Sequence, residues 1–163
     1  MEQKYIYSFS QIEDKVKALH ETNTEAAAAA LSWLGLSRDE LKTLRVSDYN
    51  STMRMLHSAG RVVYVREDLI ADMLKAICEE APEYSMGFFI TDVNSAYEAA
   101  EKQELSPISV LKMRYFYEKH SAKLSGEPED RVFLKEILRS VGESEADMEK
   151  QFAEYEKDAP EKI

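Results

Sequence analysis

The chain has 163 residues, of which 44% are hydrophobic and 32% charged, and its formal net charge is −10. These proportions are those of one folded domain, which excludes a disordered chain, and no apolar run is long enough to cross a bilayer. The negative charge opposes tight binding to nucleic acid, because affinity for DNA depends on lysine and arginine at the phosphates.

Helical spacing and capping residues predict three helices at the start of the chain. A capping-box pattern that begins at Ser10 opens the first helix. The alanine-rich segment 24–34 predicts a second helix, which ends at Gly35. A second capping box, from Ser37 to Glu40, begins the third helix.

The following residues change from helical to β-strand character. Two β-rich runs, 52–57 and 61–65, flank the turn-forming segment 58–60 and predict a β-hairpin. Helical spacing returns over 67–80. The apolar run 86–91 then predicts a short strand or a buried loop.

Three further helices are predicted between this apolar run and the C-terminal helix. One covers 92–103, and the next begins at Ser106 and Pro107 and runs to about residue 124. A third extends from Pro128 to Gly142.

The C-terminal helix begins after Ser144, a suitable N-cap, and has an apolar face formed by Met148, Phe152 and Tyr155. We expect residues 1–158 to form a single domain, followed by a frayed tail over 159–163. The predicted fold is mainly α-helical with a small β-hairpin or sheet, and is therefore of the α+β class.

Three segments together resemble the catalytic domain of the tyrosine recombinases, the phage integrase family. Segment 34–49 resembles the family's first conserved box, and the matching residues are Gly35, Leu36, Glu40, Leu41, Leu44 and Asp48. Segment 106–117 resembles the second box, a helix with His-x-x-Arg, and segment 137–144 is similar to the Leu-Gly-His-Ser turn. The resemblance implies the recombinase catalytic fold without the family's separate N-terminal DNA-clamping domain.

The resemblance also implies that the reacting groups are missing. In the family, a tyrosine attacks a DNA phosphodiester while arginines and a histidine or tryptophan stabilise the phosphate charge. Ser37 stands at the first arginine, Leu111 at the histidine of the second box and Glu143 at the histidine or tryptophan. Phe152 stands at the nucleophile, and only Arg114 keeps the family's residue type. We therefore expect a pseudo-recombinase with no catalytic activity.

The leading hypothesis is a protein that acts in DNA recombination or mobile-element regulation through protein contacts. Its partner would be a second copy of the chain or an intact recombinase, because family members dock a C-terminal helix into a neighbour. Met148, Phe152 and Tyr155 would form the docking face, although the same helix is equally suited to packing on its own domain.

Three alternatives remain open at this point. A weak DNA-binding competitor at a recombinase site would use Arg54, Arg61, Lys112, Arg114 and Lys119. An active recombinase would need displaced groups such as Tyr155 as the nucleophile, with His120 nearby. The third alternative is an unrelated helical interaction protein.

The sequence predicts no cofactor, no metal site, no membrane association and no evident small-molecule substrate. His20 and His57 lack metal-ligand spacing, so we interpret both as surface or packing residues. Cys78 has no second cysteine to pair with, and no secretory signal follows Met1, which predicts a cytoplasmic protein. Acidic neighbours disfavour a Cys78 thiolate, so we interpret this cysteine as structural.

Overall fold

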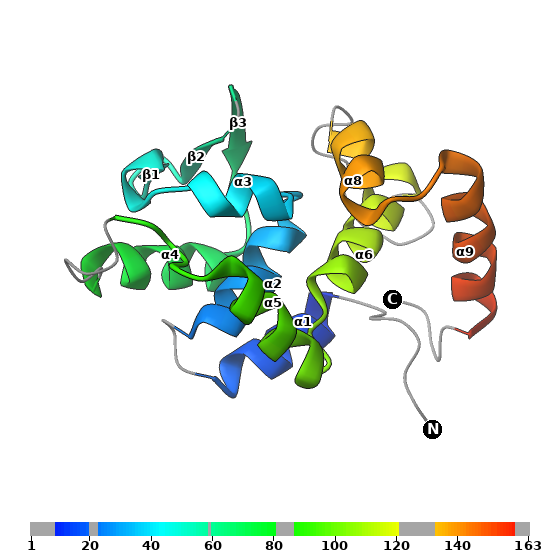
Figure 1. Ribbon diagram of the computed structural model, residues 1–163, viewed down its shortest axis with the longest axis horizontal. Helices are drawn as coiled ribbons and strands as arrows, with labels where there is room; N and C mark the ends of the chain where they lie inside the picture. Colours follow the sequence, from blue (N-terminus) through cyan, green and yellow to red (C-terminus); the bar gives the residue numbers. More distant parts are fainter. Residues whose placement is uncertain (1–8, 20–22, 59, 81–86, 121–132, 159–163) are drawn as a thin grey trace.

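The computed structural model describes residues 9–19, 23–58, 60–80, 87–120 and 133–158. Within these ranges, the side chains of Phe9, Arg61, Phe133 and Asp158 are outside the description. The described part is mostly helical and contains one three-stranded antiparallel sheet, which confirms the predicted α+β class (Figure 1). None of its helices is long and apolar enough to cross a membrane.

Helices and strands do not alternate along the described chain, because the strands of the sheet all lie in one stretch between helices. In chain order they are α1 (Phe9–Lys17), α2 (Thr24–Trp33), α3 (Arg38–Thr43), the 3-10 helix η1 (Val46–Asp48), β1 (Tyr49–Asn50), β2 (Met55–Ser58), β3 (Arg61–Tyr64), α4 (Asp68–Glu80), α5 (Val93–Lys102), α6 (Pro107–Lys119), α8 (Phe133–Val141) and α9 (Glu145–Asp158). The predicted helices over 24–34, 67–80 and 92–103 are therefore confirmed.

Side-chain caps explain where most of these helices begin. The Asn23 side chain accepts hydrogen bonds from two backbone N–H groups at the start of α2. The predicted caps Ser37, Ser106 and Ser144 each accept a hydrogen bond from a backbone N–H in the first turn of α3, α6 and α9. The prediction for Ser10 is wrong, since α1 already includes that residue. A Ser-x-x-Glu pattern also fits inside a helix, so it does not define the start by itself.

Two predicted boundaries differ from the structure. The first predicted strand covered 52–57, but β2 begins only at Met55, because Arg54 adopts a left-handed backbone conformation with φ of 53° that interrupts the extended chain. Helix α6 ends at Lys119 rather than near residue 124. The predicted helix start at Pro128, the tail over 159–163 and His20 lie outside the described residues.

The sheet has one more strand than the predicted hairpin. β1 pairs with β2 through Tyr49 and Leu56, and β2 pairs with β3 through Leu56 and Val63. These three side chains are buried on the face that meets the helices. The sequence does not predict β1, because two residues are too few to show the alternation of a strand. The apolar run after residue 86 is a buried loop, in which Phe88 forms an isolated bridge with Arg45.

Helix α2 lies at the centre of the core and packs against α5 on one side and α6 on another (Figure 1). Its residues from Ala26 to Trp33 are all buried, so this helix is enclosed around its whole circumference. Alanine has no side chain beyond Cβ, and five alanines in succession therefore allow the neighbouring helices to approach closely.

The C-terminal helices α8 and α9 are built on α6. Helix α8 runs alongside α6, and α9 lies at the edge of the molecule, farthest from the sheet (Figure 1). The apolar face of α9 is turned towards α6, since Phe152 and Tyr155 each place their ring centroid 5.3 Å from that of Phe116. In the single chain, α9 thus packs on its own domain.

Candidate functional site

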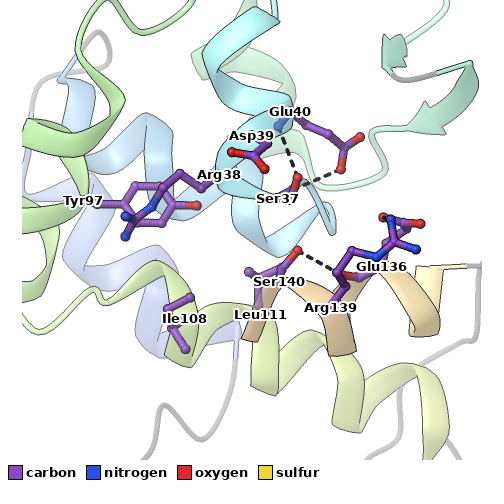
Figure 2. A pocket seen from close by; sticks show the side chains of 10 residues that line it. All are labelled: Ser37, Arg38, Asp39, Glu40, Tyr97, Ile108, Leu111, Glu136, Arg139 and Ser140. Atoms are coloured by element: carbon purple, nitrogen blue, oxygen red, sulfur yellow. Dashed lines mark hydrogen bonds and ion pairs between the residues drawn. The ribbon is translucent and has the colours of Figure 1, made fainter. Parts of the chain in front are cut away.

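Two of the positions aligned with recombinase residues, Ser37 and Leu111, line the same cavity (Figure 2). The cavity has a volume of about 590 Å³ and lies between the N-terminal end of α3 and helix α8, with α5 and α6 contributing to its floor. The other lining residues are Arg38, Asp39, Glu40, Tyr97, Ile108, Glu136, Arg139 and Ser140.

Ser37 is held in place by the capping box of α3. Its Oγ accepts a hydrogen bond from the Glu40 N–H at 3.1 Å, and the Ser37 N–H donates to Glu40 Oε1, also at 3.1 Å. The other carboxylate oxygen of Glu40 accepts from the Ser58 hydroxyl at 2.8 Å, which joins α3 to β2. Ser37 therefore has a structural role that its neighbours in sequence explain.

The apolar side of the cavity comes from α5 and α6. Leu111 and Tyr97 are buried, while Ile108 is half-buried. Burial raises the pKa of Tyr97, although Ser32 and Arg38 lower it and Asp39 raises it. The side chains of Leu111 and Ile108 cannot transfer a proton, so these two residues contribute packing rather than acid–base chemistry.

Arg114 is buried in the protein interior and does not line the cavity. Only 3% of the residue is exposed, and its Nη2 donates to Glu118 Oε1 at 2.9 Å. The guanidinium carbon lies 5.3 Å from the ring centroid of Trp33 in α2. A guanidinium that is buried and bound in this way is not presented to a DNA phosphate.

Glu143 lies in the link between α8 and α9. It accepts hydrogen bonds from Lys112 at 3.4 Å and from Gln151. These contacts tie the link to α6 on one side and to α9 on the other. A carboxylate here would repel a phosphate rather than stabilise it.

Phe152 belongs to an aromatic cluster between α9 and α6. Its ring stacks on that of His120 with centroids 3.7 Å apart and an interplanar angle of 6°. His120 Nε2 lies 2.9 Å from Glu149 Oε2, and Tyr155 is almost fully buried in the same cluster. His120 and Tyr155, which the active alternative requires, therefore hold α9 in place.

The structure brings Ser37 and Leu111 together but separates Arg114 from Phe152. Phe152 contacts α6 through Phe116, and residues two positions apart in a helix project about 200° apart. Arg114 and Phe152 thus lie on opposite sides of α6.

Most of the cations predicted to bind DNA are paired with carboxylates. The nitrogen-to-oxygen distances are 2.8 Å for Arg54–Asp68, 3.4 Å for Lys112–Glu143, 2.9 Å for Arg114–Glu118 and 2.5 Å for Lys119–Glu145. The hydrogen bond from Lys119 lowers the pKa of Glu145. Arg61 is in β3, but its side chain is not among those described.

Comparisons of the chain with known proteins do not identify its family. No family model, no curated protein and no solved structure matches it. Membership of the tyrosine recombinase family therefore remains a prediction from the three sequence segments.

Several residues of the cavity were missed from the sequence. Arg139 and Glu136 approach α3 only because α8 folds back onto α6, and no local pattern signals that approach. Tyr97 had a usable signal, since it shares an apolar helical face with Val93 and Ala100.

The structure also describes the positions of His57 and Cys78. His57 is exposed on β2. Cys78 is half-buried, its thiol points at the Val46 carbonyl at 3.6 Å, and burial raises the pKa of that thiol. The exposure of His57 agrees with its interpretation as a surface residue, and the burial of Cys78 agrees with its interpretation as a structural cysteine. Among the described residues, no three histidine, cysteine, aspartate or glutamate side chains are grouped as a metal site would require.

Proposed function

We propose that this chain is a non-catalytic relative of the tyrosine recombinases that acts through contacts with a second copy or with an intact recombinase. Its setting would be DNA recombination or the regulation of a mobile element. One observation supports the proposal most: the five aligned side chains are all engaged in the structure of the chain itself.

Phosphoryl transfer would require these groups to face a common phosphate. Ser37 caps a helix, Leu111 packs in the cavity floor and Glu143 carries the wrong charge. Arg114 is paired in the interior, and Phe152 has no nucleophilic oxygen. Activity would therefore demand the simultaneous release of contacts on two sides of α6.

The lack of activity is tested with a nicked duplex that traps a covalent protein–DNA intermediate. We expect no adduct on a denaturing gel under conditions in which an intact recombinase forms one. An adduct that disappears in Tyr155→Phe would identify a displaced nucleophile and contradict the proposal. Because Tyr155 is buried, the folding of this variant is checked by circular dichroism.

The protein partner is tested by light scattering of the full chain, alone and mixed with an intact recombinase. Deleting α9 is a poor test, because it would uncover Phe116 and the rest of the aromatic cluster. Lys150→Glu and Ala153→Arg are better, since both positions are exposed on α9. We expect a complex that these substitutions weaken. The proposal would be contradicted if the chain is a monomer at all concentrations and forms no complex with the recombinase.

A further inference from the structure

The cavity between α3 and α8 has the size of a small-molecule site. Its volume of about 590 Å³ lies within the range of roughly 300 to 1,000 Å³ that is typical of ligand pockets. Ile108 and Leu111 form an apolar floor, while both walls are polar (Figure 2). Most of the lining residues are polar or charged, so the cavity is more polar than a typical ligand pocket and suits a charged ligand.

The two walls of the cavity both carry positive and negative side chains. Helix α3 contributes Arg38 and Asp39, and α8 contributes Arg139 and Glu136. Glu40 also lines the cavity, but both of its oxygens already accept hydrogen bonds from other residues. The lining therefore holds two guanidiniums and three carboxylates, and Glu40 is the carboxylate whose oxygens are already engaged.

The charged groups are held loosely enough to serve a ligand. Arg139 and Glu136 are 3.7 Å apart in a pair whose arginine side chain is 78% exposed, and such surface pairs are worth only about 0–1 kcal/mol. Arg38 lies over the Tyr97 ring, with its guanidinium carbon 4.4 Å from the centroid. Stacking on the ring orients the guanidinium at the edge of the cavity.

We propose that this cavity binds a small zwitterion of the amino-acid or dipeptide class. Its aliphatic part would lie against Ile108 and Leu111, and its carboxylate and ammonium groups would meet the arginines and carboxylates of the two walls. A ligand with one sign of charge would be attracted by some of these charged groups and repelled by the others. A zwitterion can satisfy both signs, and the mixed charge of the walls thus selects it over a phosphate.

The experiment measures binding of L-alanyl-L-leucine to the full chain by calorimetry. The same peptide is compared after N-acetylation and after C-amidation, each of which removes one charge. We expect saturable binding of the zwitterion and a loss of affinity of about tenfold or more for each modified form. Glu136→Gln and Arg139→Gln should each weaken binding of the unmodified peptide by a similar factor.

Lys135→Gln is the matched control, because Lys135 is exposed on α8 but does not line the cavity. It should leave the affinity unchanged, and thermal unfolding should show that all three variants are folded. The absence of saturable binding, equal binding of the charge-deleted peptides, or an equal effect of Lys135→Gln would each overturn the inference. None of these results bears on the adduct and light-scattering tests, so the two proposals fail separately.

Discussion

Arg114 and Glu118 form an ion pair in the protein interior. Its arginine and glutamate side chains are 4% and 1% exposed, so both charges have been removed from water. Removing a charge from water costs several kcal/mol, and the partner must offset that cost. An arginine that matched the recombinase motif is therefore explained by a local interaction one helical turn away.

We predict that Arg114→Met destabilises the protein by roughly 3 kcal/mol, because it removes the guanidinium that pairs with the buried Glu118 carboxylate. The double variant Arg114→Met/Glu118→Leu should recover much of that loss, since it removes both charges. Urea unfolding of the single and double variants measures the difference. The exposed pair of Arg139 and Glu136 is the control, and breaking it should cost no more than about 1 kcal/mol.

Cys78 provides a prediction with a defined pH dependence. Burial, followed by the charge of Glu79, raises the pKa of its thiol in the folded chain. The folded state therefore favours the neutral thiol. This contribution to stability is complete below the unfolded-state pKa near ~8.5 and is lost as the pH rises through the folded-state pKa.

We accordingly expect iodoacetamide to alkylate Cys78 more slowly in the folded protein than in urea at pH 8, with the difference narrowing as the pH rises. Mass spectrometry of timed samples measures both rates. Faster reaction in the folded protein would show that the thiol is activated and would contradict the structural interpretation.

Helix α2 shows how one element organises the others. Its alanines are enclosed by α5 and α6, and the contact distance between helices depends on the size of the side chains between them. The sequence analysis predicted the helix from its composition but not its central position. Burial on all sides is a property of the neighbours, and the neighbours are distant in sequence.

Enlarging one of these alanines should disturb the packing. We predict that Ala28→Leu costs about 1–3 kcal/mol, because Ala28 is fully buried and the added atoms must displace α5 or α6. Chemical denaturation measures the loss. Ala153→Leu makes the same change at an exposed position of α9 and should alter stability by less than about 0.5 kcal/mol. Equal effects at both sites would mean that α2 is not enclosed.

At the scale of the whole molecule, the net charge of −10 and the pairing of the predicted DNA-binding cations act in the same direction. We predict weak duplex binding even at low salt, with a logarithmic salt dependence of slope about −2 or shallower. Fluorescence anisotropy of a labelled duplex measures this slope. Lys119→Gln should change it little, because Lys119 is already bound to Glu145. A steep slope that Lys119→Gln reduces would favour the DNA-binding alternative.

The sequence was sufficient where neighbouring residues decide the structure. Capping at Ser37 and at Ser144 depends on residues within one turn, so both helix starts were predictable. The ion pair of Lys112 with Glu143 and the approach of α8 to the cavity depend on residues far apart in the chain. Single-sequence patterns carry no information on such contacts.

The enclosed position of α2 has a consequence for how the chain is made. Its main packing partners, α5 and α6, are synthesised long after it, since α6 ends at Lys119. A growing polypeptide therefore leaves the ribosome with an apolar alanine segment that lacks its two main packing partners until most of the protein has emerged. Translation speed and chaperone access over that interval, rather than the order of helices alone, should govern the yield of native protein in the cell.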